Sequence, residues 1–171
     1  MNETKKADYT PSHVANFFLD KAEEEGIPIT QMKLQKLVYI GYGWCLAVLD
    51  VKLFDEHIGV WQHGPVIASL YHEFKRYGSH HIAEKSVKFD LDNKLTLEPS
   101  IPHIDKANHK VIEVLTIVWN SYKPLSAWAL RDKTHENGTP WSTAKNNCHD
   151  YLEDDSIKNH FHEKIQEYLH G

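Results

Sequence analysis

The segment that most constrains the fold of this 171-residue chain is residues 30–49, because its second half is apolar on every side. Thr30 can cap a helix there, and apolar residues then recur three or four positions apart. This stripe consists of Leu34, Leu37, Val38, Gly41, Cys45, Val48 and Leu49. The other sides of the second half are filled by Tyr39, Ile40, Trp44, Leu46 and Ala47. Because a helix that is apolar all round has to be buried, the sequence predicts a central helix covered by the rest of the fold.

Two glycines and the length of this apolar segment add to the prediction. Gly41 and Gly43 each cost roughly 1 kcal/mol of helix propensity, so we expect them to let a neighbouring element approach closely. The longest apolar run, residues 37–51, is too short to cross about 30 Å of hydrocarbon. We therefore expect no transmembrane segment.

Weaker patterns predict the elements around this helix. Helical spacing occupies residues 10–26, 65–78, 105–123, 126–131 and 156–170, and residues 140–141 open one or two more turns. We expect Thr10, Asp105 and Ser126 to cap three of these helices, and Asp154 and Asp155 to lie at the positive end of the last one.

Extended structure is expected at two places. Ile58 and Val60 alternate as a short extended piece, and residues 63–66 then turn the chain into the next helix. Residues 87–97 predict a two-stranded hairpin with one buried face, turning at Asp92 and Asn93.

The expected fold class is mainly α (α+β), a compact helical domain of about six helices with a small β-hairpin. We expect a single domain over residues 1–171, with a core at about 12–146 and a C-terminal helix at about 156–170.

Composition favours a folded intracellular protein. Hydrophobic residues make up 41% of the chain, which suffices for a core. Cys45 and Cys148 cannot form a disulfide framework, and Cys45 lies within the apolar helix. Residues 1–8 lack the apolar core of an export signal, so we expect the protein to stay in the cytoplasm.

Nucleic-acid binding is a minority interpretation, because a formal net charge of -5 is unfavourable for contact with phosphates. The helix after Thr30 and the hairpin at 87–97 could form a winged-helix arrangement that exposes Lys33 and Lys36. Two cations are fewer than recognition helices usually carry. We therefore do not expect nucleic acid to be the partner.

Thirteen histidines raise the question of a metal site. The groups to consider are His80 with His81, His160 with His162, and Cys148 with His149. None of them supplies the two close ligand pairs of a tetrahedral zinc site, so we expect no bound metal. A P-loop and a glycine-rich fingerprint are also missing from the sequence, and we expect no cofactor.

The segment 131–136 gathers opposite charges, a hydroxyl group and an imidazole. One interpretation gives His135 and Glu136 an acid–base role. The alternative, which we favour, is a helix C-terminus whose last carbonyls are bonded by cationic or hydroxyl side chains. Neither cysteine stands in a catalytic context and the sequence has no nucleophile elbow, so no catalytic residue is assigned.

Aromatic residues near turns and helix starts offer a different kind of site. They are Trp61, Tyr71, Trp128 and Trp141. Aromatic anchors of this sort suit binding to a protein partner, although ordinary core packing explains any one of them equally well.

An ordered series of motifs resembles one known family. The motifs are MKLQKLVY at 32–39, GW at 43–44, LFDE at 53–56, VWQHGPV at 60–66 and YHEFKRYG at 71–78, followed by Leu125-Ser126, Thr134-His135 and Pro140-Trp141. Over about residues 12–146 this pattern resembles the SocA-like antitoxin family, also called the Panacea domain and formerly the phage-associated GepA-like protein.

The resemblance implies a bacterial or prophage antitoxin that neutralises a cognate toxin protein, encoded by an adjacent gene, by direct binding. Family members are paired with unrelated types of toxin, so the resemblance does not name the partner. It leaves room for an adaptor that delivers the toxin to a cytoplasmic protease. Two further alternatives come from the residues: an enzyme that reverses a toxin's modification, suggested by the segment around His135, and a transcriptional autoregulator, suggested by the 87–97 hairpin.

The resemblance and the side-chain chemistry together nominate residues for a shared groove. The candidate partner-binding residues are Trp61, His63, Tyr71, Arg131, His135 and Trp141. Four further motif positions are expected to be structural, namely Leu34, Leu37, Gly64 and Pro65. Residues 136–139 and the helix from Ser156 are the parts in which partner specificity is expected to vary.

Overall fold

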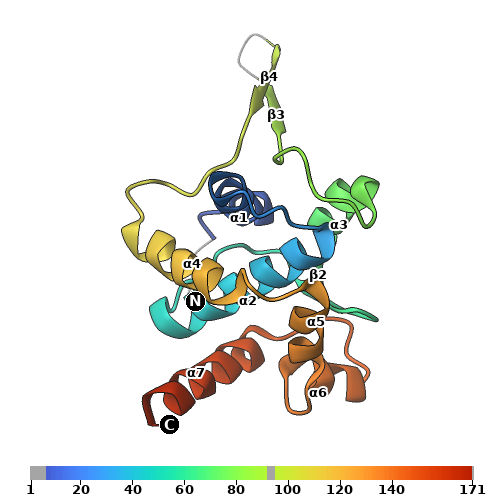
Figure 1. The fold of residues 1–171 in the computed structure, drawn as a ribbon, viewed down its shortest axis with the longest axis vertical. Helices are drawn as coiled ribbons and strands as arrows, with labels where there is room; N and C mark the ends of the chain where they lie inside the picture. Colours follow the sequence, from blue (N-terminus) through green and yellow to red (C-terminus); the bar gives the residue numbers. More distant parts are fainter. Residues whose placement is uncertain (1–6, 92–94, 171) are drawn as a thin grey trace.

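The computed structural model describes residues 7–91 and 95–170 and confirms a mainly helical fold (Figure 1). Its helices are α1 (Pro11–Glu25), α2 (Gln31–Leu49), α3 (Ala68–Phe74), α4 (His109–Tyr122), α5 (Ala127–His135), α6 (Pro140–Asn146) and α7 (Asp154–His170), with the 3-10 helix η1 (Lys75–Tyr77). Two antiparallel pairs are formed by β1 (Ile58–Trp61) with β2 (Gly64–Ile67) and β3 (Lys88–Leu91) with β4 (Leu97–Ser100). Within the described ranges, no helix is both long and apolar enough to span a membrane.

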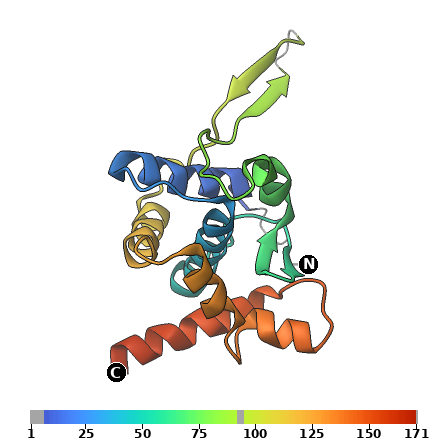
Figure 2. The same ribbon diagram turned by 45° about the vertical axis from the view of Figure 1, so that its right-hand side comes forward.

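The helix α2 lies in the middle of the fold, as its apolar pattern predicts. Figure 2 shows α1 above it, α4 and the β1–β2 hairpin on opposite sides of it, and α7 below it. Leu34, Leu37, Val38 and Cys45 of α2 are each at most 1% exposed. Because burial of one large apolar side chain is worth about 1.5–3 kcal/mol, the buried face of this helix makes a large contribution to the stability of the core.

Both glycines of α2 mark close contacts, as expected. A Cβ atom on Gly41 would lie 2.8 Å from Cδ2 of Leu115 in α4. A Cβ atom on Gly43 would overlap the ring of Phe161 in α7. The Phe161 ring also lies 5.4 Å from the ring of Trp44, centroid to centroid, and is 2% exposed. The missing side chain of Gly43 is therefore the notch into which α7 docks.

The start of α7 is held by a carboxylate. Asp154 accepts a hydrogen bond from the Tyr42 hydroxyl at 2.6 Å and pairs with the Lys52 ammonium at 3.0 Å. An acidic residue in the first turn also interacts favourably with the helix dipole. The helix begins at Asp154, two residues before the expected start.

The N-cap residue was predicted correctly at three helices, by Thr10, Thr30 and Ser126, and wrongly at a fourth. Thr30 and Ser126 accept hydrogen bonds from the third main-chain N–H that follows them. The N-cap of α4 is Asn108 and not Asp105, which instead accepts from the Ala107 N–H in the preceding turn. The expectation failed because both residue types suit a cap and the sequence offers them only three positions apart.

The β1–β2 hairpin corrects the expectation of one extended piece followed by a turn into a helix. Residues 64–67 form a strand, in which Gly64 pairs with Trp61 and Pro65 with Val60. All four residues of β2 are buried, so the strand has no polar alternation by which it could be recognised. The turn consequently lies at Gln62 and His63, one step earlier in the chain.

Side chains and a distant segment hold this hairpin in place. Gln35 of α2 donates to the Ile67 carbonyl at 3.0 Å and accepts from the Ile67 N–H at 2.9 Å. On the other edge, residues 150–152 run beside β1, where the Leu152 N–H donates to Ile58 at 2.8 Å. These bonds satisfy main-chain groups that a two-stranded sheet would leave free.

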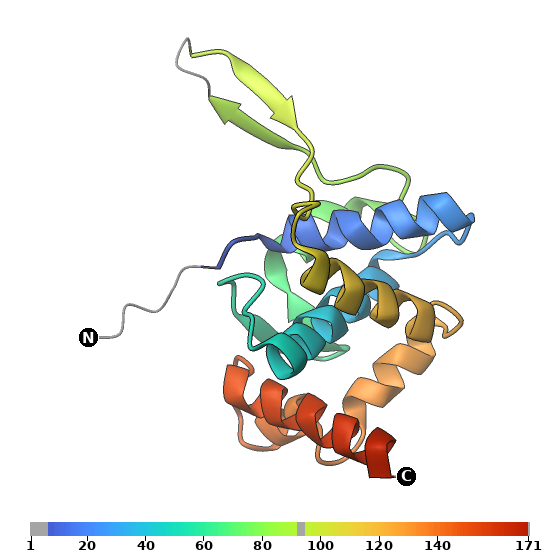
Figure 3. The same cartoon turned by 90° about the vertical axis from the view of Figure 1, so that its left-hand side faces the viewer.

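The β3–β4 hairpin exists, but the prediction that one of its faces is buried was wrong. Figures 1 and 3 show the hairpin projecting away from the helices. Its register puts Phe89, Leu91 and Leu97 on one face, and these side chains are 64%, 62% and 63% exposed. Alternation predicts a two-sided strand but not whether the fold supplies a surface to cover it. The turn expected at Asp92 and Asn93 lies outside the described residues.

We predict that Gly43→Ala destabilises the protein, although the same change inside an ordinary helix stabilises it by up to about 1 kcal/mol. The added methyl group has to displace the Phe161 ring, and overpacking of this kind typically costs about 1–3 kcal/mol. Urea unfolding measures the change. In a Phe161→Leu background the cost of Gly43→Ala should shrink, and an undiminished cost would argue against the notch.

Candidate functional site

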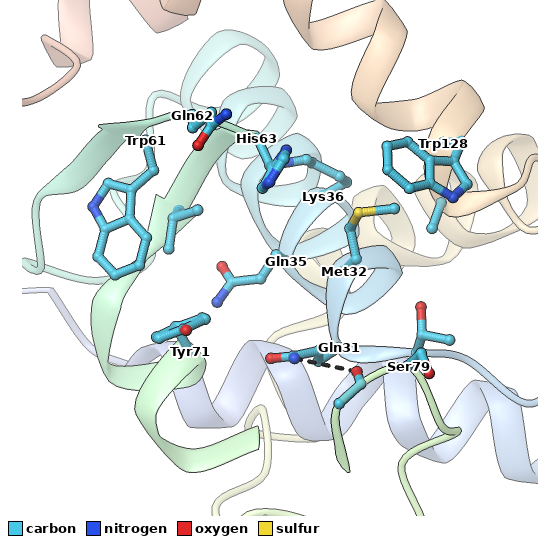
Figure 4. Close-up of a pocket in the computed structure, with 14 residues that line it drawn as sticks. Gln31, Met32, Gln35, Lys36, Trp61, Gln62, His63, Tyr71, Ser79 and Trp128 are labelled. Carbon is cyan, nitrogen blue, oxygen red and sulfur yellow. Dashed lines mark hydrogen bonds between the residues drawn. The ribbon is translucent and has the colours of Figure 1, made fainter. Parts of the chain in front are cut away.

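The site is a pocket of about 650 Å³ between the first turns of α2, the β1–β2 turn, α3 and the start of α5 (Figure 4). Its volume is within the usual range of small-molecule and peptide pockets. Its apolar walls are Met32, Trp61, Val66, Tyr71, Ala127 and Trp128. It is therefore an apolar recess assembled from four separate parts of the chain.

Aromatic side chains form two walls of the pocket. Trp61 and Tyr71 pack edge to face, with ring centroids 5.0 Å apart. Trp128 is 61% exposed, and the Arg131 guanidinium lies 5.7 Å from its ring centroid. In Figure 4 the two tryptophans lie on opposite sides of the recess. Exposed aromatic rings beside a preformed recess are the usual composition of a protein-binding surface.

Lys36 lies deep in the pocket and is 1% exposed, which corrects the expectation that Lys33 and Lys36 are surface cations. The Lys36 ammonium donates to the Pro65 carbonyl at 3.0 Å, and that of Lys33 donates to the Lys123 carbonyl at 2.6 Å. Burial, and the positive charge of Arg131, lower the pKa of Lys36 to about 7. Polarity alone misled here, because a long aliphatic stem lets a lysine lie in a core while its ammonium reaches a carbonyl.

The segment 131–136 is a helix end, as favoured. The Thr134 hydroxyl donates to the Arg131 carbonyl at 2.7 Å, and Nδ1 of His135 lies 2.7 Å from the same oxygen. The helix α5 continues to His135, four residues beyond the expected end. Hydroxyl and imidazole groups therefore bond the last carbonyls of α5.

His135 and Trp141 also hold the β1–β2 turn from outside the pocket. Nε2 of His135 lies 3.3 Å from the Gln62 carbonyl oxygen, and the Trp141 indole donates to the Trp61 carbonyl at 2.9 Å. Their two rings pack with centroids 3.8 Å apart. Both side chains thus fix the position of the pocket wall that carries Trp61.

The structure divides the six candidate binding residues into two groups. Trp61, His63 and Tyr71 line the pocket, whereas Arg131, His135 and Trp141 lie behind or beside it. Leu34, Leu37, Gly64 and Pro65 are buried, as expected of structural positions.

Sequence reasoning missed the contribution of α2 to the pocket, from Gln31, Met32, Gln35 and Lys36. The signal was present, because three of these residues belong to the family motif at 32–39, but none of them was nominated as a binding residue.

The histidine pairs are not part of a larger cluster of possible metal ligands. Among the described residues, no three His, Cys, Asp or Glu side chains are placed so that they could hold a metal ion together. His80 and His81 are exposed, as expected for loop histidines. The polar groups that line the pocket include the amides of Gln31, Gln35 and Gln62, the ammonium of Lys36 and the imidazole of His63.

Comparison with known proteins gives two matches. Residues 34–142 match the family described as "Antitoxin SocA-like, Panacea domain". The chain is 32% identical over 133 residues to Antitoxin SocA of Caulobacter vibrioides (strain NA1000 / CB15N), covering 78% of this chain and 69% of that protein. No solved structure matches the chain. The matched residues 34–142 include Lys36, Trp61, Tyr71 and Trp128 of the pocket.

We predict that Gly64→Ala destabilises the protein more than Gly138→Ala, by about 1–3 kcal/mol. Both glycines have positive φ, at +106° and +82°. A Cβ atom on Gly64 would lie 2.7 Å from Nζ of Lys36 and 2.9 Å from Oγ1 of Thr134, whereas one on Gly138 meets nothing within 4 Å. Gly138→Ala therefore measures the cost of backbone strain without a steric clash. If both variants lose the same free energy of unfolding in urea, the contact with Lys36 does not contribute to the cost of Gly64→Ala.

We predict that Lys36 makes the free energy of unfolding rise with pH above neutrality. Its pKa is about 7 in the folded protein and 10.5 in the unfolded chain, so between about pH 7 and about pH 9 the unfolded chain binds more protons. The slope from this one residue is at most about 1.4 kcal/mol per pH unit. Urea unfolding across this range should give a smaller slope for Lys36→Met than for the natural protein. Equal slopes would contradict the assignment.

Proposed function

This chain belongs to the family of SocA-like antitoxins that carry a Panacea domain, and we propose that it neutralises a toxin protein by binding it directly. The toxin is the product of an adjacent gene, and the complex forms without turnover. The binding surface is the pocket between α2, the β1–β2 turn and α5.

The observation that carries this proposal is the exposure of Trp61 and Trp128 around an apolar recess. Their side chains are 38% and 61% exposed. Tryptophan is strongly enriched among the residues that dominate protein–protein binding energy, and such residues cluster around well-packed pockets. The main-chain and side-chain bonds to Ile67 and to the Trp61 carbonyl hold this recess in shape, which lowers the entropic cost of binding.

Charge supports a partner with a basic surface. The formal net charge is -5, and opposite charge on the toxin would speed encounter at low salt. The association rate would then fall as the salt concentration rises.

The alternative roles receive different support. A proteolytic adaptor also has to bind the toxin, and it differs from a direct inhibitor in the fate of the bound toxin. The enzyme alternative rests on His135, whose two ring nitrogens face the main-chain carbonyls of Arg131 and Gln62. The autoregulator alternative keeps its hairpin but loses the exposed cations, because Lys33 and Lys36 are buried. The described part of the β3–β4 hairpin carries Lys88 together with Asp90 and Glu98.

We predict that co-expression with the toxic neighbouring gene restores growth and that the two proteins co-purify. Trp128→Ala should weaken the complex by at least about tenfold, because it removes a central aromatic anchor. Tyr168→Ala is the matched control, since Tyr168 is 88% exposed near the end of α7, away from the pocket.

The outcomes separate the roles. Restored growth with no complex, and with the toxin still present, would replace binding by an enzymatic role. Restored growth with a loss of toxin that depends on a protease would indicate the adaptor. If Trp128→Ala and Tyr168→Ala bind the toxin equally, the pocket is not the binding surface.

A further inference from the structure

One end of the pocket holds positive charge that the fold does not neutralise. Lys36 lines the pocket with its ammonium buried, and that ammonium has one acceptor, the Pro65 carbonyl. An ammonium group carries three N–H donors, and none of the ion pairs between described residues includes Lys36. A buried charge without a counter-charge is costly, so this group favours an anionic neighbour.

Arg131 brings a second cation to the same place. Its charge disfavours protonation of Lys36, and its buried Nε has no hydrogen-bond partner among the described residues. Its ion pair is with the next residue, Asp132, whose side chain is 71% exposed. His63 lines the pocket nearby, and a Cβ atom on Gly64 would contact Lys36 and His135 together. The described residues that line the pocket include no Asp or Glu.

The other end of the recess holds an unsatisfied acceptor. Gln31 donates through Nε2 to the Gly78 carbonyl at 3.2 Å (Figure 4). Its Oε1 is buried and has no hydrogen-bond partner in the part of the chain that the structure describes. Gln31 and Lys36 are five residues apart in α2, or about 7.5 Å along the helix axis. Two residues of extended peptide span about the same distance.

We propose that the pocket binds a short extended segment of the partner protein that carries a carboxylate, which pairs with Lys36 in the positive field to which Arg131 contributes. This inference rests on the proposed function and names the chemistry of the segment. A main-chain N–H of the segment donates to Oε1 of Gln31. An apolar side chain of the segment lies between Trp61, Tyr71 and Trp128.

The carboxylate can belong to the C-terminus of the partner or to an acidic side chain, and three dipeptide probes distinguish these sources. They are acetyl-Leu-Phe with a free carboxylate, the same dipeptide as its amide, and acetyl-Phe-Glu amide. Binding is followed by NMR through the indole N–H signals of Trp61 and Trp128. We expect the free acid or the glutamate probe to bind at least about tenfold more tightly than the neutral amide. The tighter of the two identifies the source.

Lys36→Met tests the assignment, because it keeps the stem of the side chain and removes the charge. In this variant the difference in affinity between the carboxylate probe and the neutral amide should disappear. Lys33→Met is the matched control, since Lys33 is also a buried lysine of α2 that donates to a carbonyl, but it does not line the pocket. Arg131→Gln, at a partly exposed site, gives a second test that does not depend on the stability of the Lys36 variant.

Three results would overturn the inference: equal binding of acid and amide, a preference that survives both Lys36→Met and Arg131→Gln, or no binding of any probe at millimolar concentration. These results are separate from the fate of the proposed function. A protein that neutralises its toxin but shows no carboxylate preference refutes only the inference. A carboxylate preference without neutralisation of any toxin refutes the proposed function and leaves the anion site in place.

Discussion

The body of this protein is organised around α2, which contacts helices α1, α3, α4, α5 and α7 and the strand β2. The second half of this helix is apolar on every side and needs cover, and α1, α4, α7 and the β1–β2 hairpin share that task. The two glycines of α2 decide where the closest partners lie, Leu115 of α4 at Gly41 and Phe161 of α7 at Gly43. The need to bury apolar surface does not by itself fix how helices pack, but the close contacts at Gly41 and Gly43 give the packing of α4 and α7 a specific geometry.

The polar residues in the first turns of the same helix place the pocket. Gln35 and Lys36 cannot be buried without hydrogen-bond partners, and both find them on β2, at Ile67 and Pro65. The hairpin is therefore fixed to α2 by polar bonds on one side and by the chain at 150–152 on the other. The hydrogen bonds that Gln35 and Lys36 make to β2 therefore also fix the position of the pocket wall that carries Trp61.

The sequence predicted those parts of the fold that depend on local pattern. The burial of α2, the close contacts at Gly41 and Gly43, and the caps at Thr30 and Ser126 all follow from residues near one another in the chain. The β1–β2 pair could not be predicted in this way, because its strands are four residues long and β2 is buried throughout. Three of the candidate site residues line the pocket, but the depth of Lys36 depends on where β2 lies, and no local pattern carries that information.

The docking of α7 at Gly43 also means that the core can close only late in synthesis. The ribosome releases α2 early, whereas Phe161, which fills the notch, leaves near the end of synthesis. Until then one side of the most apolar helix of the chain faces water, and incomplete domains of this kind are prone to aggregate. A chain that stops before Phe161 would contain every residue of the pocket and still lack a closed core. The supply of working protein is therefore tied to the completion of translation.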